Sequence, residues 1–229
     1  VQHTGVIPFL KKFEATVRSC TQNGVRGGSA TVHFPIWHQE IEDILVLKNN
    51  KGTEDNRVRK LDYSIQISAL FYQRFLNNED ITLFSPHSVP GLYEAFGTEE
   101  FDELYEKYER ATSVPKTKVS ARELFTDMLK ERAETGRIYI MNIDHCNTHS
   151  SFTDKVNMSN LCQEITLPTD PLTHIDGEGE IALCILSAIN VGTIKLEELS
   201  NLCDLAVRGL EELIDFQEYP VGAAKRSTK

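Results

Sequence analysis

The sequence has no long apolar run and is short of basic side chains, and each absence excludes a class of protein. No apolar stretch approaches the roughly 20 residues that a membrane-spanning helix needs, and the start carries no charged segment followed by an apolar one, as a secretory signal would. Lys and Arg number 24 against 34 Asp and Glu, and the resulting net charge of −10 argues against a nucleic-acid-binding surface. We expect a cytoplasmic protein that binds neither membrane nor nucleic acid.

Cysteine and tryptophan are also scarce, with five Cys and one Trp in 229 residues, although a hydrophobic content of 40% suffices for a sizeable core. The cysteines are odd in number and widely spaced, which does not suit a disulfide framework and favours reduced or redox-active thiols. The chain begins at Val1 rather than Met and ends in a basic run at 223–229. We therefore expect a segment that is incomplete at both ends.

Hydrophobic periodicity predicts helices that alternate with strands, which is typical of α/β architecture. Helices are predicted near residues 9–17, 101–108 and 196–213, and one more lies between a Ser120/Glu123 capping box and Gly136. Strands or extended runs are predicted at 30–34, 81–84, 138–140, 160–167 and 181–186. Asp62 is predicted to cap a further helix, whose apolar face includes Ile65, Leu70, Phe71 and Phe75.

The segment at 160–164 carries the most chemistry. Extended backbone would project Asn160, Cys162 and Glu164 from one face, so that an amide, a thiol and a carboxylate converge. A thiol can deliver a hydrogen atom, a carboxylate can take a proton from a hydroxyl, and an amide can hold a second hydroxyl. A polyol such as a ribose would suit this trio. The alternative is a strand with one buried cysteine and a polar edge.

Cys184 lies in a second apolar run, which could form a strand beside the first. A cysteine in such a run is usually an inert core residue. A second thiol near the first would be useful in redox chemistry, because a dithiol supplies two electrons when it closes to a disulfide. Sequence spacing alone leaves both interpretations open.

Five ordered motifs now resemble one family, the large catalytic subunit of class I ribonucleotide reductase. They are NLCQEITLPT at 160–169, GEIALC at 179–184, SCTQNGVRGG at 19–28, DITLFSPH at 80–87 and GRIYI at 136–140. The resemblance runs nearly end to end. It implies that residues 1–229 are part of a ten-stranded α/β barrel, with an internal loop that carries the radical cysteine at its tip.

The resemblance also implies a role for each residue of the trio. Cys162 would become a transient thiyl radical that removes the ribose 3′ hydrogen, Glu164 would act as base toward the 3′ hydroxyl, and Asn160 would hydrogen-bond the ribose hydroxyls. Cys184 would be one of two cysteines that reduce the 2′ carbon. No cofactor or metal would be bound in this segment, because the family obtains its radical from a metal-containing small subunit.

The glycine-rich loop at 24–28 could adapt to a nucleobase or a phosphate, or it could be a solvated turn before a strand. In the resembled family the corresponding loop relays the identity of a bound deoxynucleotide or ATP effector to the substrate site. Cys20, Gln22, Arg26, Gly27 and Gly28 fall on it. We expect Gln22 and Arg26 to contact the base and Cys20 to be structural rather than redox-active.

Several parts of the resembled subunit are not found in this sequence. They are the N-terminal ATP-binding domain, the loop for the substrate diphosphate, the cysteine that pairs with Cys184, and the C-terminal tail. We therefore expect no turnover by this segment alone. The expected partners are the remaining large-subunit segments, the radical-generating small subunit, thioredoxin or glutaredoxin as reductant, a ribonucleoside diphosphate substrate, and a second copy of the full subunit in a homodimer. The alternative is an incomplete nucleotide-binding or assembly fragment.

Two smaller features have plainer interpretations. The group Asp144, His145, Cys146 and His149 offers metal-type ligands, but its spacing matches no zinc pattern and favours a polar loop. Cys203 is interpreted as a small core residue on the last helix.

Overall fold

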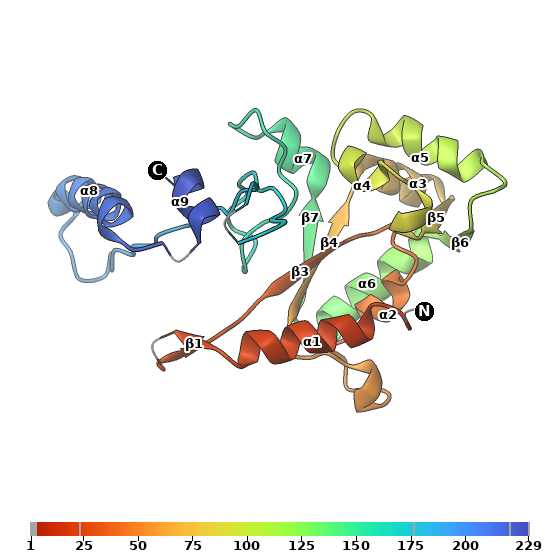
Figure 1. The fold of residues 1–229 in the computed structure, drawn as a ribbon, viewed down its shortest axis with the longest axis horizontal. Coiled ribbons are helices and arrows are strands. Elements are labelled where there is room, and N and C mark those ends of the chain that lie inside the picture. The colour runs from red at the N-terminus through yellow and green to blue at the C-terminus, as the bar shows by residue number, and fades with distance from the viewer. Residues whose placement is uncertain (1–3, 23, 176, 220, 229) are drawn as a thin grey trace. The chain divides into compact units, whose positions relative to one another are not determined.

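The computed structural model describes residues 4–22, 24–175, 177–219 and 221–228 (Figure 1). They fall into two compact units, Val1–Thr166 and Leu167–Lys229, and each is described by itself. The first unit contains the sheets and the hydrophobic core. The second contains a 3-10 helix (η3, Leu196–Glu198) and two α-helices, α8 (Leu199–Phe216) and α9 (Gly222–Thr228).

A three-stranded parallel sheet organises the first unit. Its order is β3 (Thr31–Pro35), β4 (Asp62–Ile67) and β7 (Ile138–Asn142). Before this sheet come α1 (Ile7–Arg18) and the small hairpin of β1 (Thr21–Gln22) and β2 (Arg26–Gly27). A short α2 (Ile41–Leu45) and a 3-10 turn η1 (Glu54–Asn56) connect β3 to β4.

The connection from β4 to β7 is longer and contains its own two-stranded antiparallel sheet, of β5 (Asp80–Phe84) and β6 (Lys116–Ser120). The remaining elements here are α3 (Ala69–Asn77), η2 (Pro86–Ser88), α4 (Leu92–Ala95), α5 (Phe101–Arg110) and α6 (Ala121–Thr135), and α7 (Ile143–Thr148) follows β7. The α/β class predicted from periodicity is confirmed.

The two faces of the parallel sheet differ in polarity. Partners across a parallel ladder share a face, and successive residues alternate between faces. One face carries apolar side chains, which belong to the core together with residues of α3 and α6: Phe34, Tyr63, Ile65, Ile67 and Ile138. The other face carries mostly polar side chains in register: Thr31, His33, Ser64, Gln66 and Tyr139. Ser64 and Gln66 are nonetheless buried, so something other than water covers them.

Several predicted elements are confirmed, including the strand at 81–84 and the helix at 101–108. The helix α6 has both predicted ends: the Ser120 hydroxyl accepts a hydrogen bond from the Glu123 amide (3.3 Å), and Gly136 takes the left-handed conformation at its exit. The helix capped by Asp62 is wrong, because residues 62–67 form β4. Their strict polar–apolar alternation is the period of a half-polar strand, and the helix begins only at Ala69.

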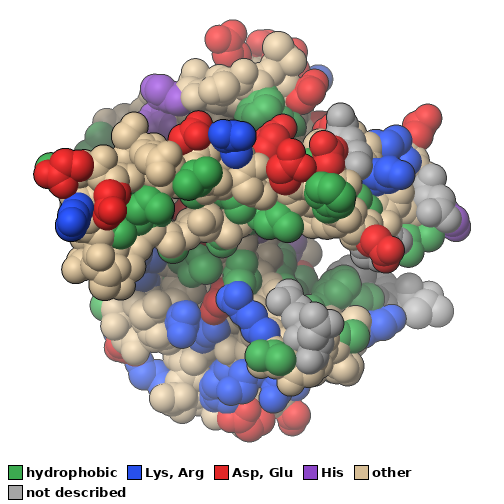
Figure 2. Space-filling model, turned by 90° about the vertical axis from the view of Figure 1, so that its left-hand side faces the viewer, with side chains coloured by type: hydrophobic (Ala, Val, Ile, Leu, Met, Phe, Trp, Pro, Cys, Tyr) green, Lys and Arg blue, Asp and Glu red, His purple; other side chains and the backbone are tan. Residues whose placement is uncertain are grey.

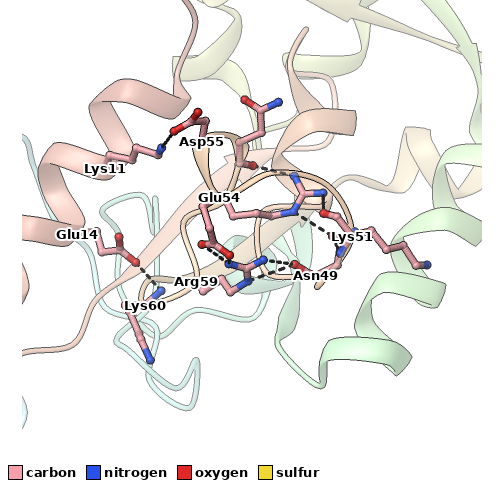
Figure 3. A network of polar contacts seen from close by, with 10 residues as sticks. Lys11, Glu14, Asn49, Lys51, Glu54, Asp55, Arg59 and Lys60 are labelled. Carbon is pink, nitrogen blue, oxygen red and sulfur yellow. Dashed lines mark hydrogen bonds and ion pairs between the residues drawn. The ribbon is translucent and has the colours of Figure 1, made fainter.

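The loop between α2 and β4 is built around Asn49, which is 5% exposed (Figure 3). Its backbone oxygen accepts from Nε and Nη2 of Arg59 (3.2 and 3.0 Å), and its side-chain oxygen accepts from Arg57 Nε (3.0 Å). The Lys60 amide then donates to Glu14 of α1 (2.6 Å). This network fixes α1, and with it the start of the β1–β2 hairpin, to the entrance of β4.

The second unit buries few apolar side chains. None of the residues of α8 is buried, and Phe216 is 80% exposed. On the surface drawn in Figure 2, hydrophobic side chains lie between charged ones. The helix itself was predicted, but Cys203 is exposed, so its interpretation as a core residue is wrong. The predicted strand at 181–186 is also wrong, because that run has no regular structure and no strand partner among the described residues.

Two further findings concern sites and membranes. Residues 144–148 belong to α7, so the predicted polar loop is wrong. The described part of the chain holds no group of three or more His, Cys, Asp or Glu side chains placed to bind a metal ion. Within the same residues, no helix is both long enough and apolar enough to span a bilayer.

Candidate active site

Residues 160–165 form a closed turn rather than an extended strand. The Asn160 carbonyl accepts from the Gln163 amide (3.2 Å), and the Asn160 amide donates to the Ile165 carbonyl (3.2 Å). The Asn160 side-chain oxygen accepts from the Ile165 amide (3.0 Å). The prediction of an extended backbone with three side chains on one face is therefore wrong. An asparagine side chain that bonds to nearby backbone competes with a strand ladder and favours a turn.

Gln163 gives this turn its unusual backbone. Its φ is 65°, and among the described residues the only other non-glycine residue with positive φ is Asn78, at the end of α3. The left-handed conformation costs an ordinary L-residue about 1–2 kcal/mol. The side chain offsets that cost with two hydrogen bonds to the parallel sheet: Oε1 accepts from Ser64 Oγ (2.7 Å), and Nε2 donates to the Ile140 carbonyl (2.5 Å).

The turn and the residues before it lie on the polar face of the sheet. Thr31 Oγ1 donates to the Leu161 carbonyl (2.6 Å), and Gln66 Nε2 donates to the Asn157 carbonyl (2.6 Å). The cover over Ser64 and Gln66 is thus an irregular segment of the same chain. Its carbonyls take up donors that would otherwise be buried without a partner, a condition that buried polar groups rarely tolerate.

Two side chains on the polar face have shifted pKa values. Burial lowers the pKa of His33 to about 4, against a smaller opposing effect of the Ser159 backbone, so His33 is neutral at pH 7. Burial raises the pKa of the Tyr139 phenol, and the neighbouring Cys162 thiol and Asp62 carboxylate raise it further, although Arg137 lowers it. Tyr139 therefore presents a protonated phenol beside Cys162.

The predicted trio lies together on this one turn. Cys162 and Glu164 are exposed, and Asn160 is half-buried. The Asn160 side-chain oxygen is already bonded within the turn, so its amide N–H groups are what it can offer to a hydroxyl. Cys184 belongs to the second unit, where it is exposed in a segment without regular structure.

The predicted effector loop is an exposed hairpin. Gln22 pairs with Arg26 across its two strands, and the side chains of Arg26 and Cys20 are exposed, whereas the Gln22 side chain lies outside the described part of the structure. The Gly28 amide donates to the Cys20 carbonyl (3.2 Å). A Cβ atom on Gly28 would stand 2.3 Å from the Val17 carbonyl oxygen, so the close return to α1 requires glycine, whereas one on Gly27 would meet nothing within 4 Å.

Sequence reasoning missed the residues that hold the turn. Thr31 and Ser64 bond to the turn from the sheet, and Gln163 bonds to the sheet from the turn. Gln66 bonds to Asn157, in the segment before the turn. The available signal was the alternation in β4, where Ser64 and Gln66 interrupt an otherwise apolar strand. Because parallel sheets are usually covered on both faces, a polar face on β4 indicates a lined interior rather than a solvent-facing surface.

Comparisons with known proteins identify the fold around this turn. The family model described as "Ribonucleotide reductase, barrel domain" matches residues 1–229. The chain therefore belongs to the ribonucleotide reductase barrel-domain family, and its parallel sheet and helices are consistent with part of an α/β barrel.

Individual relatives agree. The chain is 59% identical over 233 residues to the ribonucleoside-diphosphate reductase subunit alpha of Haemophilus influenzae, covering 99% of this chain and 31% of that protein. It is 59% identical over 231 residues to the ribonucleoside-diphosphate reductase 1 subunit alpha of Escherichia coli K12 (98% and 30%) and 44% identical over 238 residues to the subunit alpha of Enterobacteria phage T4 (100% and 31%). The chain thus spans about 31% of the length of such relatives.

Proposed function

We propose that this chain carries the radical-thiol centre of a ribonucleoside-diphosphate reductase, within its ten-stranded catalytic barrel. One observation carries the proposal: in a chain of this family, the turn that bears Cys162, Glu164 and Asn160 is bonded onto the polar face of the parallel sheet. A polar sheet face with a thiol standing on it offers hydrogen-bond donors and acceptors to a small polar substrate.

Cys162 begins the reaction as a thiyl radical and takes the hydrogen atom from the 3′ carbon of the ribose, which leaves a thiol and a carbon radical. Glu164 accepts the proton of the 3′ hydroxyl, and the Asn160 amide donates to a ribose hydroxyl. The radical comes from a metal-containing small subunit.

Reduction then occurs at the 2′ carbon. Its hydroxyl leaves as water and a hydrogen replaces it, while two thiols lose two hydrogens in total and close to a disulfide. The 3′ oxygen then takes back the proton from Glu164, and the 3′ carbon takes back the hydrogen atom from Cys162, which restores the thiyl radical. Cys184 is one of these thiols, and its partner is supplied by another segment of the large subunit. Thioredoxin or glutaredoxin reopens the disulfide. The site works in the cytoplasm, in a homodimer of the full subunit.

The β1–β2 hairpin has the regulatory role. Gln22 and Arg26 contact the base, and the backbone around Gly27 and Gly28 passes the identity of a deoxynucleotide or ATP effector to the substrate site. Support comes from the exposed, glycine-rich form of the hairpin and from its position, since only residues 28–30 separate β2 from β3, whose Thr31 bonds to the carbonyl beside Cys162.

The test is deoxynucleotide formation from a ribonucleoside diphosphate by the complete reductase, which combines this chain, the remaining large-subunit segments, the radical-generating subunit and a dithiol. Cys162→Ser is expected to abolish turnover. Cys203→Ser, which replaces an exposed cysteine on α8, is the matched control and should keep it. Full turnover in the Cys162→Ser protein would refute the proposal.

A further inference from the structure

Gln163 has no catalytic role in the proposed reaction, but its hydrogen bonds indicate another function. We propose that Gln163 is a positioning residue for Cys162: its side-chain amide, held by Ser64 and by the Ile140 carbonyl, fixes the height of the thiol above the sheet. The inference rests on the proposed function, because it assigns the position of the same thiol.

The side-chain amide of Gln163 is held at two points by hydrogen bonds to the sheet. Ser64 lies in β4 and Ile140 in β7, neighbouring strands of one parallel sheet. Gln163 accepts from the first (2.7 Å) and donates to the second (2.5 Å), so both ends of its planar amide are used. An amide with both ends bonded to a rigid sheet fixes its own position and rotation, and Cys162 is the adjacent residue.

The backbone of Gln163 supports the same inference. A left-handed turn is most easily made by glycine, and Asn78 shows the common exception at the end of a helix. Glutamine in this conformation needs compensation from its surroundings, and such residues cluster where geometry matters for function. Here the compensation comes from the side chain, which glycine would lack.

Cys162 is also held from its other side. Thr31 Oγ1 donates to the carbonyl of Leu161 (2.6 Å), the residue that precedes the cysteine. The residue before Cys162 is bonded to β3, and the residue after it is bonded to β4 and β7. These bonds leave Cys162 little freedom to move away from the sheet. Tyr139 of β7 lies on the same polar face of the sheet as Ser64, beside the thiol.

Hydrogen-atom transfer makes this position matter. Reacting atoms must stand about 3–3.5 Å apart, and a shift of about 1 Å can lower a rate on the order of a hundredfold. Loss of these two hydrogen bonds should therefore lower the rate of the chemical step. Substrate binding should not change, since neither Gln163 nor Ser64 is assigned a contact with the substrate. The expected signature is a lower kcat at an unchanged KM.

The experiment uses the complete reductase. Gln163→Met keeps the length of the side chain and removes both hydrogen bonds, and kcat should fall roughly 10- to 100-fold with KM unchanged. Ser64→Ala removes one partner from outside the turn and should lower kcat roughly tenfold. Ser64→Thr keeps a hydroxyl and should restore turnover to near the native value. The double variant Ser64→Ala/Gln163→Met should be no slower than Gln163→Met alone.

The matched control is Gln66→Met, which removes the same kind of bond between the same strand and the same segment, but at Asn157. It should lower stability without the loss in kcat. An equal loss of kcat in Gln66→Met, or native kcat in both Gln163→Met and Ser64→Ala, would overturn the inference. If Gln163→Met does not fold, the Ser64→Ala and Ser64→Thr pair decides alone. Native turnover in Cys162→Ser would instead refute the proposed function.

Discussion

Replacing Asn160 by Asp or Ala separates the structural role of this side chain from its role toward the substrate. The Asn160 side-chain oxygen accepts from the Ile165 amide at 3.0 Å, while its N–H groups are the donors proposed for a ribose hydroxyl. Asp keeps an acceptor in the same place and loses the donors. Ala loses both. The two variants are therefore expected to lose the donor to the substrate alike, and only Ala is expected to loosen the turn.

The magnitudes follow from the bonds lost. A hydrogen bond of this kind contributes about 1 kcal/mol, so in Asn160→Ala the Ile165 amide should exchange with solvent roughly fivefold faster. In Asn160→Asp that exchange should stay at the native rate. Loss of a donor to the substrate costs about 1–3 kcal/mol, so Asn160→Asp should lose roughly 5- to 150-fold in kcat/KM and Asn160→Ala at least as much.

The two assays are hydrogen exchange followed by mass spectrometry on a peptide that spans residues 157–166, and steady-state kinetics of the complete reductase. Native kcat/KM in Asn160→Asp would show that the amide does not donate to the substrate. Unchanged exchange in Asn160→Ala would show that the side chain does not hold the turn. Either result would refute the corresponding half of the reasoning.

Three further predictions concern the frame around the site. Burial by itself would raise the pKa of Glu109, but its bonds to Arg74 (2.6 and 2.7 Å) lower the pKa overall. The pair therefore stabilises the fold fully at pH values above the ordinary Glu pKa, and the stabilisation is lost as the pH falls. In denaturant unfolding, Glu109→Gln should lower the free energy of unfolding by about 3 kcal/mol near neutral pH and make it less sensitive to acid. Gly28→Ala should disrupt the hairpin, because its Cβ would stand 2.3 Å from the Val17 oxygen, and effector-dependent changes in substrate preference should be lost while basal turnover persists. Gly136→Ala should cost about 1 kcal/mol in the same unfolding assay, since φ is 67° there. The first expectation would be contradicted if Glu109→Gln were as stable as the native protein at neutral pH, and the second if Gly28→Ala kept the native effector response. The third would be contradicted if Gly136→Ala lost no stability.

Local signals in the sequence were sufficient wherever the structure is locally determined. The ends of α6 follow from Ser120 and Gly136, and both are where the sequence placed them. The strand β4 was missed because the apolar residues of β4 and α3 were joined into a single helical pattern starting at Asp62. Alternation over six residues was the better guide.

The form of the Cys162 turn could not be predicted in the same way. Its backbone depends on the bond between Gln163 and Ser64, which are 99 positions apart, and on Thr31, which is 130 positions from Leu161. The residue types at 160–164 indicated chemistry, but only the fold determines which carbonyls and hydroxyls are near enough to favour a left-handed glutamine. The prediction of a strand at 181–186 failed for a related reason, because the described residues of its unit form no strand that could pair with it.

The most direct test of the central claim is to exchange segments between relatives. Residues 1–229 would replace the matching segment of the Haemophilus influenzae subunit alpha, to which they are 59% identical, and the chimera would be assayed with its radical-generating subunit for deoxynucleotide formation. The account predicts turnover that disappears on Cys162→Ser. A folded chimera that binds nucleotide but forms no product, with or without that substitution, would contradict it.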